Sequence, residues 1–248
     1  MKRVLFKHRS IRKFRSTPIP EEILREVLEA AVRASTCGNM QLYSLVVTRD
    51  QAVKEQLLPC HFGQQMVTQA PCVVTVCADV HRFSMWCEQR EAEPAYDNFA
   101  WFLNASTDAL LAAQNLTIQA EMNGLGICFL GTTIYTAQQI CSVLQLPKGV
   151  VPLTTIVMGY PDEEPELTDR LPLEAVVHYE KYQDYTAAEI DELWAEREES
   201  DETRKLLEEN DLPNLARIFT ERRYVKEDNL AISRTYFEML KEKGFFNN

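Results

Sequence analysis

The stretch from Asn98 to Gly131 reads NFAWFLNASTDALLAAQNLTIQAEMNGLGICFLG, and it contains the longest apolar-rich segment of the chain. Residues 98–123 follow a helical pattern, and the run Ala109–Ala113 makes this helix apolar on most of its sides. A helix that is apolar all round lies in a protein core or in a subunit interface. A Gly-Leu-Gly sequence ends the helix, and a strand is predicted over residues 127–130.

The glycines of this stretch do not match the fingerprint of a dinucleotide-binding fold. That fingerprint, Gly-x-Gly-x-x-Gly, follows a strand and opens a helix. Here a helix precedes a strand, and four residues separate Gly126 from Gly131. A Rossmann-type site is therefore excluded by order and by spacing. The glycines either only end the helix or, at Gly131, let the backbone approach a flat ligand.

The segments on either side of this stretch alternate between helical and extended patterns. Apolar periodicity and turn residues predict helices over 20–35, 50–58 and 136–145, strands over 43–48, 73–78 and 151–159, and a polar turn at 34–42. The last third differs, because residues 186–248 carry 16 acidic and 10 basic side chains and follow the pattern of successive amphipathic helices. Such a tail is either a helical cap or an arm that lies on a partner.

The charge of the chain argues against two classes of partner. Its formal net charge is −11 over 248 residues, whereas nucleic acids and anionic membranes favour clustered Lys and Arg. The N-terminal apolar run of three residues is too short for a secretory signal. Polar residues interrupt the most apolar segment, residues 99–122. We therefore expect a cytoplasmic protein that binds neither nucleic acid nor membrane.

The cysteines and histidines form no pattern typical of a disulfide framework or a metal site. The seven cysteines include no Cys-x-x-Cys pair, and most of them lie within apolar runs such as residues 72–77. His61, His81 and His178 show no metal-ligand spacing. We expect buried, reduced thiols and no metal.

A basic segment near the N-terminus, His8-Arg9-Ser10-Ile11-Arg12-Lys13-Phe14, is the first candidate site. In an extended chain, alternation puts Ser10 and Arg12 on one side and Ile11 on the other. A hydroxyl flanked by guanidinium groups can bind a phosphate through charge-assisted hydrogen bonds. The alternative is a basic tail that is only solvated.

A polar loop after the first predicted helix, Ser35-Thr36-Cys37-Gly38-Asn39-Met40-Gln41, is the second candidate. Its hydroxyl and amide groups can hydrogen-bond the edge of a planar heterocycle. The alternative is an ordinary turn at the end of a helix, where Gly-Asn is common. A further candidate is Arg170, which lies in the Pro-rich connection of residues 161–172 and is otherwise an ordinary exposed arginine.

Four motifs in a fixed order make the chain resemble the nitroreductase family. They are Arg-Ser-x-Arg-x-Phe at 9–14, a Ser-containing loop ending in Gly-Asn-x-Gln at 38–41, a helix ending in Gly-Leu-Gly at 124–126, and Gly-Tyr-Pro at 159–161 followed by Arg-Leu-Pro at 170–172. The chain is most similar to the larger oxygen-insensitive NADPH nitroreductase and flavin reductase subgroup. There His-Arg-Ser-x-Arg opens the chain, and a Gly-Gln turn precedes the second strand, as at Gly63-Gln64 here.

The resemblance implies an FMN site and a role for each matching residue. The FMN phosphate would be surrounded by His8, Arg9, Ser10 and Arg170. Arg12 would lie by the pyrimidine side of the flavin, near N1 and O2. The ribityl chain and the ring edge would be held by Ser35, Thr36, Asn39, Gln41 and Gln64. Gly131 would lie against the ring, with Leu130 and Thr132 on either side of it.

The resemblance also implies the fold and the assembly. Members are α+β proteins with a central mixed β-sheet flanked by helices, and two subunits interleave as a homodimer so that the site forms between them. Residues 1–185 would be the FMN-binding core, and residues 186–248 a helical C-terminal arm packing on the core and on the partner subunit. The apolar helix at 98–123 then becomes a dimer element.

The chain departs from the pattern of the subgroup at two places, which together involve three residues. Its usual Gln-Pro-Trp is Gln41-Leu42-Tyr43 here, and its Lys two residues before the Arg of Arg-Leu-Pro is Thr168. Loss of that cation weakens the case for tight phosphate binding, and it leaves the choice between NADPH and NADH open. Residues 195–220, where nucleotide contacts are expected, resemble the subgroup only loosely.

The reaction that the resemblance implies is hydride transfer from NADPH or NADH through FMN to a nitroaromatic, quinone or flavin acceptor, with ping-pong kinetics. The cofactor supplies the chemistry, and the protein orients and tunes it. No side chain is required as an acid or a base, and Arg12 would stabilise the reduced anionic flavin. One alternative is a flavin-binding protein or sensor with little turnover, and another is a scaffold acting through its acidic tail.

Overall fold

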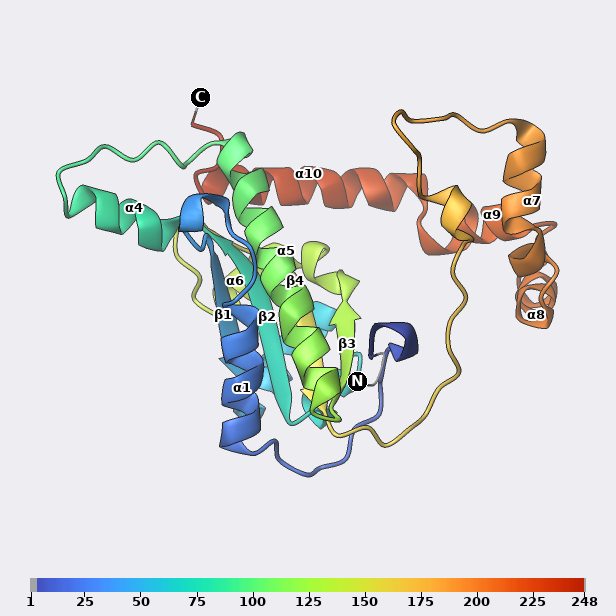
Figure 1. Cartoon of the computed structure of the whole chain (residues 1–248), viewed down its shortest axis with the longest axis horizontal. Helices are drawn as coiled ribbons and strands as arrows, with labels where there is room; N and C mark the ends of the chain where they lie inside the picture. Colours follow the sequence, from blue (N-terminus) through green and yellow to red (C-terminus); the bar gives the residue numbers. More distant parts are fainter. Residues whose placement is uncertain (1–3, 248) are drawn as a thin grey trace. The chain divides into compact units, whose positions relative to one another are not determined.

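One four-stranded sheet organises the molecule, whose computed structural model describes residues 4–247. The strand order is β1-β2-β4-β3 (Figure 1). The strands are β1 (Tyr43–Thr48), β2 (Cys72–Asp79), β3 (Gly126–Leu130) and β4 (Val150–Gly159). Neighbouring strands pair antiparallel. The parallel element expected of a mixed sheet is an isolated bridge between Ser10 and Ile127 beside β3, and the predicted α+β class is confirmed.

Both faces of the sheet are covered, as the continuous apolar runs of its strands predict. Side chains alternate across a strand, so neighbours enter different clusters. Val74 of β2 packs with α1 and α5, whereas Val73 packs in a second cluster on the opposite face. Ile156 and Val157 of β4 divide in the same way. The sheet is therefore the middle layer of three.

The first face is covered by α1 (Glu21–Ala31) and α5 (Phe99–Met122) (Figure 1). Ala109, Ala112 and Ala113 of α5 are fully buried, and their small side chains let this helix lie close to the strands. This confirms that the apolar helix lies in the core. Its role as a subunit interface stays a prediction.

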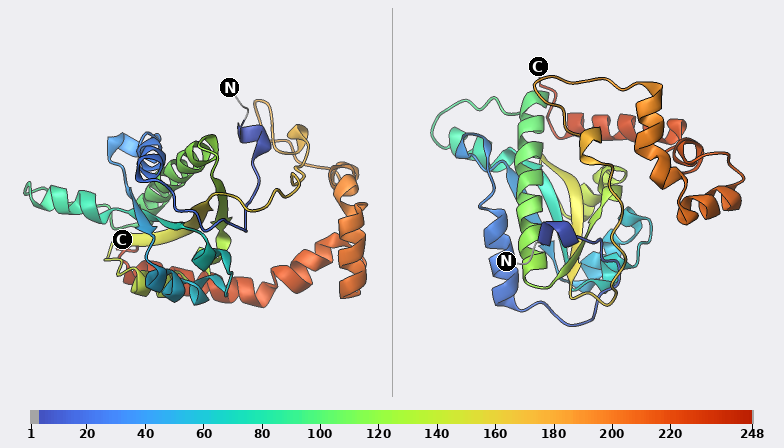
Figure 2. Two further views of the ribbon diagram at one scale, coloured as in Figure 1. Left: turned by 90° about the horizontal axis from the view of Figure 1, so that it is seen from below. Right: turned by 45° about the vertical axis from the view of Figure 1, so that its right-hand side comes forward.

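The second face is covered by shorter helices, seen on the side opposite α1 and α5 in the left view of Figure 2. They are α2 (Gln51–Leu57), α3 (Met66–Gln69) and α6 (Ala137–Val143), with the 3-10 turns η3 (Pro59–His61) and η4 (Gly131–Ile134). A further cluster joins residues near α4 (His81–Glu88) to Met239, Leu240 and Phe245. The described residues contain no helix with the length and apolarity needed to cross a membrane.

Contacts divide the chain into two compact units. The first runs to Leu167 and resumes at Arg234, and the second spans Thr168–Ser233. The second unit and its continuation are helical as predicted: α7 (Ala187–Glu198), α8 (Asp201–Asn210), α9 (Leu215–Ile218), the π-helix η6 (Phe219–Arg223) and α10 (Lys226–Glu242). Short turns complete the list: η1 (Val4–Lys7), η2 (Cys37–Asn39) and η5 (Leu173–Ala175). The division at residue 185 and the packing of the arm on a partner stay predictions.

Candidate functional site

The N-terminal segment lies along the outer edge of β3. Ser10 forms a parallel bridge with Ile127, and the Ile11 amide donates to the Ile127 carbonyl at 2.9 Å. Farther along, Phe14 bridges Pro161. Ile11 and Phe14 are buried, so their apolar side chains anchor the segment against the sheet. The polar residues between them are thereby held at a fixed place on the sheet edge.

The close approach of this segment to β3 depends on Gly126. A Cβ atom built at this residue would lie 2.6 Å from Cγ1 and 2.8 Å from Cβ of Ile11. Both distances are shorter than van der Waals contact, so any other residue would push the segment away. The second glycine of the Gly-Leu-Gly motif is therefore needed so that Ile11 can pack against β3.

Alternation points the polar side chains of the segment in two directions. Burial raises the pKa of the Cys128 thiol in β3, and the charge of Arg12 and a hydrogen bond with Ser10 oppose that rise. Ser10 and Arg12 therefore lie together on the Cys128 side. Arg9 and Ile11 instead line a cavity. The neighbourhood of Ser10 and Arg12 agrees with the predicted alternation, but Ile11 packs in the same apolar cluster as Cys128, so their placement on opposite sides stays a prediction.

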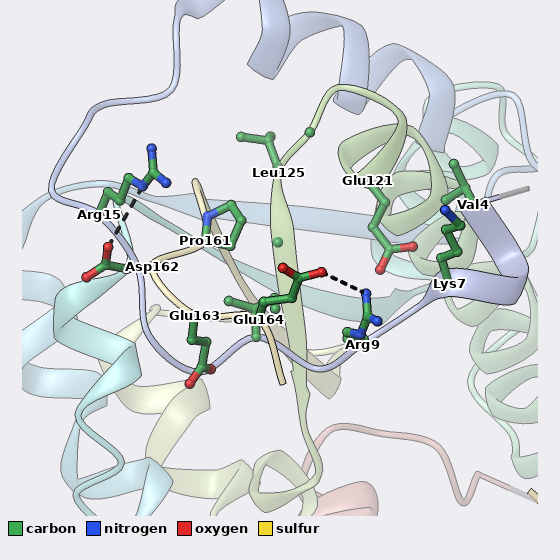
Figure 3. A pocket seen from close by; sticks show the side chains of 13 residues that line it. Val4, Lys7, Arg9, Arg15, Glu121, Leu125, Pro161, Asp162, Glu163 and Glu164 are labelled. Atoms are coloured by element: carbon green, nitrogen blue, oxygen red, sulfur yellow. Dashed lines mark ion pairs between the residues drawn. The ribbon is translucent and has the colours of Figure 1, made fainter. Parts of the chain in front are cut away.

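The cavity beside Arg9 has a volume of about 540 Å³ and is lined by both acidic and basic side chains (Figure 3). The Arg9 guanidinium lies 3.8 Å from the Glu164 carboxylate. Nδ1 of His8 lies 2.6 Å from the Glu121 carboxylate, which also lines the cavity. Carboxylates repel a phosphate group. The structure thus gives His8 and Arg9 acidic partners, and their part in phosphate binding stays a prediction.

Beyond β3, the turn η4 presents Gly131 to solvent. Gly131 is exposed, and a Cβ atom there would have open space around it among the described residues. Below it, the buried Thr133 hydroxyl donates to the Leu130 carbonyl at 2.9 Å and lies 3.0 Å from Oγ1 of Thr155, from which it can accept. Hydrogen bonds hold the turn on its buried side, and its solvent side at Gly131 is open, so a flat ligand can approach the backbone there.

The turn η3 packs against η4 and carries a buried histidine. His61 is 0% exposed, and its Nδ1 lies 2.8 Å from Oγ1 of Thr132. Its Nε2 is buried and has no hydrogen-bond partner among the described residues. Burial lowers the pKa of His61 to about 4, which makes the imidazole neutral at pH 7. Gln64, partly exposed, follows three residues later.

The polar loop before β1 folds around a buried carboxylate of α5. Asp108 is 2% exposed and accepts hydrogen bonds from the Thr36 hydroxyl at 2.5 Å and the Cys37 amide at 2.9 Å. It also accepts from the Leu42 amide at 3.2 Å. Oγ1 of Thr36 in turn accepts from the Gln41 amide at 2.8 Å. The two ends of the loop are therefore tied to one carboxylate.

Left-handed backbone in this loop exposes its amide side chains. The φ angles of Asn39 and Gln41 are 56° and 52°, and both residues are exposed, as is Ser35. Nε2 of Gln41 donates to the Asn39 carbonyl at 2.7 Å, and the Arg82 guanidinium donates to the Gln41 carbonyl. Positive φ at residues other than glycine is unfavourable and is found preferentially at ligand-binding sites.

The predicted site residues fall into separate groups within one chain. The polar loop leads into β1, whereas Ser10, Arg12 and the turn with Gly131 lie at β3, and these strands form opposite edges of the sheet. Arg170 belongs to the second unit, where its guanidinium donates to Oγ1 of Thr168 at 2.8 Å. One chain therefore does not bring the polar loop together with the N-terminal segment.

Sequence reasoning missed two residues that shape this site, Asp108 and His61. Asp108 interrupts an apolar helix, and an acidic residue at such a position is a signal for a buried partner, although the sequence does not say which. No local signal marks His61 as buried. Within residues 4–247, no three His, Cys, Asp or Glu side chains are grouped so that they could hold a metal ion.

Comparison with known sequences relates the chain to one family. The model of the nitroreductase family matches residues 5–160. An NADPH-dependent oxidoreductase of Staphylococcus aureus is 33% identical over 180 residues, which make up 71% of this chain and 71% of that protein. Residues 5–160, which the family model matches, contain the N-terminal segment, the polar loop and the turn with Gly131.

Solved structures extend the similarity to almost the whole chain. A crystal structure of a Bacteroides fragilis protein matches with a TM-score of 0.96 at 47% identity, covering 98% of this chain and 99% of that one. The NADPH:FMN oxidoreductase from Vibrio harveyi, solved with NAD+, matches with a TM-score of 0.81 at 26% identity, covering 99% and 98%. The chain is similar to these proteins in the second unit as well as in the sheet.

Proposed function

The chain belongs to the nitroreductase family, and on this basis we propose that it binds FMN and transfers hydride from NADPH or NADH to a nitroaromatic, quinone or flavin acceptor. Membership makes the chain an oxidoreductase. The name of the Vibrio harveyi relative, an NADPH:FMN oxidoreductase, supports the choice of cofactor and donor.

The observation that carries this proposal is the bridge between Ser10 and Ile127, which lays the N-terminal segment beside β3. The bridge brings a hydroxyl and the exposed guanidinium of Arg12 to β3, the strand that ends at Leu130, just before Gly131. The open space above Gly131 fits a flat ring, because a backbone without a side chain lets the ring come close. The residues present thus fit a flavin, with Arg12 by its pyrimidine side and Gly131 against the ring.

Bound FMN would supply the hydride chemistry, accepting a hydride from the nicotinamide and passing it to the acceptor. Arg12 contributes a fixed positive charge that favours the electron-rich reduced ring. Nη1 of Arg12 has a long contact of 3.5 Å with the Ser10 carbonyl, so the guanidinium can still take a stronger partner. Donor and acceptor would stack in turn on the exposed face of the ring, the face away from Gly131, which gives ping-pong kinetics.

The separation of the site residues supports a homodimer in which each site is shared. A second copy would bring its polar loop, with Asn39 and Gln41, to the β3 edge of the first. The exposed side chains of Phe99, Leu103 and Leu110 lie at helical spacing along α5 and are 43%, 50% and 50% exposed. Such an apolar stripe is typical of a surface that a subunit covers.

Two variants of the FMN-loaded protein test the proposed roles. Arg12→Ala should slow reduction of the flavin by NAD(P)H at least about tenfold, or about 1.4 kcal/mol of barrier, because negative charge reaches the ring only during hydride transfer. Arg170→Ala should instead weaken FMN retention and leave the rate at saturating FMN nearly unchanged, since a phosphate contact is the same before and after hydride transfer. Stopped-flow bleaching of the flavin measures both.

Several outcomes would contradict the proposal. A purified protein that is colourless and shows no thermal shift with FMN does not bind the cofactor. A protein that stays yellow when mixed with NAD(P)H is a flavin-binding protein without turnover. If Arg170→Ala slows reduction and Arg12→Ala only loses FMN, the two roles are reversed.

A further inference from the structure

We propose that His61 is a positioning residue, which fixes the hydroxyl of Thr132 as a hydrogen-bond donor to an acceptor atom of the flavin ring. The inference rests on the proposed FMN site at Gly131, the residue before Thr132. It starts from the contact of 2.8 Å between Nδ1 of His61 and Oγ1 of Thr132. A completely buried imidazole is here hydrogen-bonded to a partly exposed hydroxyl at the mouth of the site.

The orphaned nitrogen of His61 assigns the tautomer. A neutral imidazole carries its proton on one nitrogen and accepts on the other. Nε2 is buried without a partner among the described residues. A buried N–H without an acceptor is rarer in proteins than a buried acceptor without a donor. We therefore assign the proton to Nδ1, from which it is donated to Oγ1 of Thr132.

This assignment fixes the direction of the Thr132 hydroxyl. Because Oγ1 accepts from His61, the hydroxyl proton must be donated elsewhere. The carbonyl of Thr132 accepts from the Tyr135 amide at 3.0 Å, and the Thr136 hydroxyl donates to the Cys60 carbonyl at 2.6 Å. The second of these bonds ties η4 to η3 on the protein side. The proton of Thr132 is left to point toward the open side, where the ring would lie.

The orientation of the His61 imidazole is fixed by its surroundings. His61 is 0% exposed, and its amide donates to the Leu58 carbonyl at 3.1 Å. Phe62 and Gly63, which follow, have φ angles of 54° and 71° and turn the chain sharply away. Burial also lowers the pKa of His61 to about 4, which keeps a second proton off the ring at neutral pH. Nδ1–H is therefore a permanent donor to Thr132.

A donor at the ring edge favours reduced over oxidised flavin, because the reduced ring is richer in electrons. One hydrogen bond contributes about 1 kcal/mol, so its loss should weaken binding of reduced relative to oxidised FMN about fivefold. For a two-electron couple this lowers the midpoint potential by about 20 mV. The potential is a property that a residue with only a structural role would leave unchanged.

Spectroelectrochemical titration of the FMN-loaded protein tests the proposal. Thr132→Val and His61→Leu should each lower the midpoint potential. Thr132→Ser keeps the hydroxyl, and His61→Asn keeps an N–H near the position of Nδ1. Both variants should therefore have midpoint potentials close to that of the parent. The midpoint potential of the double variant His61→Leu, Thr132→Val should be no lower than that of Thr132→Val alone, because His61 acts through Thr132. Thr136→Val, which removes a hydroxyl bonded to a protein carbonyl, should lose stability without a shift of potential.

The flavin-free protein provides an independent readout. Nitrogen NMR of ¹⁵N-histidine-labelled protein should show His61 protonated at Nδ1, with its signal assigned by its loss in His61→Asn. A proton on Nε2, an unchanged potential in Thr132→Val, or additive shifts in the double variant would overturn the inference while FMN still binds. Failure to bind FMN at all would instead overturn the proposed function.

Discussion

The polar loop before β1 and the N-terminal segment beside β3 both carry predicted ligand-binding groups, but they are held in different ways. In the loop, one buried carboxylate, that of Asp108, accepts three hydrogen bonds from a hydroxyl and two amides. In the segment, the backbone of Arg12 and Lys13 donates to the half-buried Glu163, and the apolar anchors Ile11 and Phe14 hold the rest.

The difference shows how far each region depends on a single group. The loop keeps its shape through buried, charge-assisted bonds, which are strong where solvent is excluded. The segment depends on apolar packing and on bonds that water can replace. We infer that the shape of the loop depends on one buried group, whereas several weaker contacts together hold the segment. Four predictions test this contrast.

The largest effect is expected from Asp108→Ala. It would leave three donors of the loop without their acceptor in a buried place, and the free energy of unfolding should fall by on the order of 4 kcal/mol. Thr36→Val removes only one of these donors and should cost about 1 kcal/mol. Urea denaturation measures both. Equal effects of the two substitutions would mean that Asp108 is not the centre of the loop.

The next largest effect is expected from Gly126→Ala, which acts on the segment alone. The new Cβ would overlap Ile11, at 2.6 Å from its Cγ1, and should cost up to about 3 kcal/mol. It should also weaken FMN binding, measured by fluorescence titration. Gly131→Ala is the matched control for stability, because its Cβ would meet open space among the described residues. If both variants unfold at the same urea concentration as the parent, the segment does not pack as described.

Acid should weaken the turns next to the segment through His61. The pKa of His61 is about 4 in the folded chain and about 6.5 when unfolded, so the unfolded chain takes up the proton first. Stability is therefore complete above pH 6.5 and falls as the pH drops toward 4, by about 2 kcal/mol at pH 5. His61→Asn lacks this contribution. The urea midpoint should drop more between pH 7 and pH 5 in the parent than in His61→Asn. Equal drops in the two proteins would refute the lowered pKa of His61.

The smallest effect is expected from Glu163→Gln. The carboxylate accepts from the amides of Arg12 at 2.5 Å and Lys13 at 3.0 Å, but these donors are exposed. Water can replace the acceptor, so the loss should stay under about 1 kcal/mol. Glu166→Gln, on an exposed residue nearby, is the control. A loss as large as that of Asp108→Ala would remove the contrast between the two regions.

Local patterns predict those elements of the fold that have strong periodicity. The strand predicted over residues 43–48 is β1, and the apolar helix predicted over 98–123 is α5, Phe99–Met122. The helix α4 is not predicted, because its sequence has no clear apolar face. It begins where the Asp79 carboxylate, at the end of β2, accepts from the Arg82 amide at 3.2 Å. The residue that caps the start of α4 thus belongs to a strand, and a search for helical periodicity does not find it.

The candidate site is less predictable, because it depends on which strands are neighbours. Alternation is enough to place Ser10 with Arg12. It does not show that the polar loop and this pair lie at opposite edges of the sheet, since the order β1-β2-β4-β3 is a tertiary property. Likewise, Asp108 looks like an interruption of an apolar helix until the loop that it binds is seen.

The bridge between Ser10 and Ile127 also bears on solubility. β3 ends the sheet on one side, and an uncovered edge strand offers free amides and carbonyls to any other extended chain. Here the N-terminal segment occupies part of that edge, with the Ile11 amide bonded to the Ile127 carbonyl. The segment proposed to hold the cofactor thus also shields the strand from aggregation. Conditions that empty the site and loosen the segment should therefore favour precipitation of otherwise folded protein.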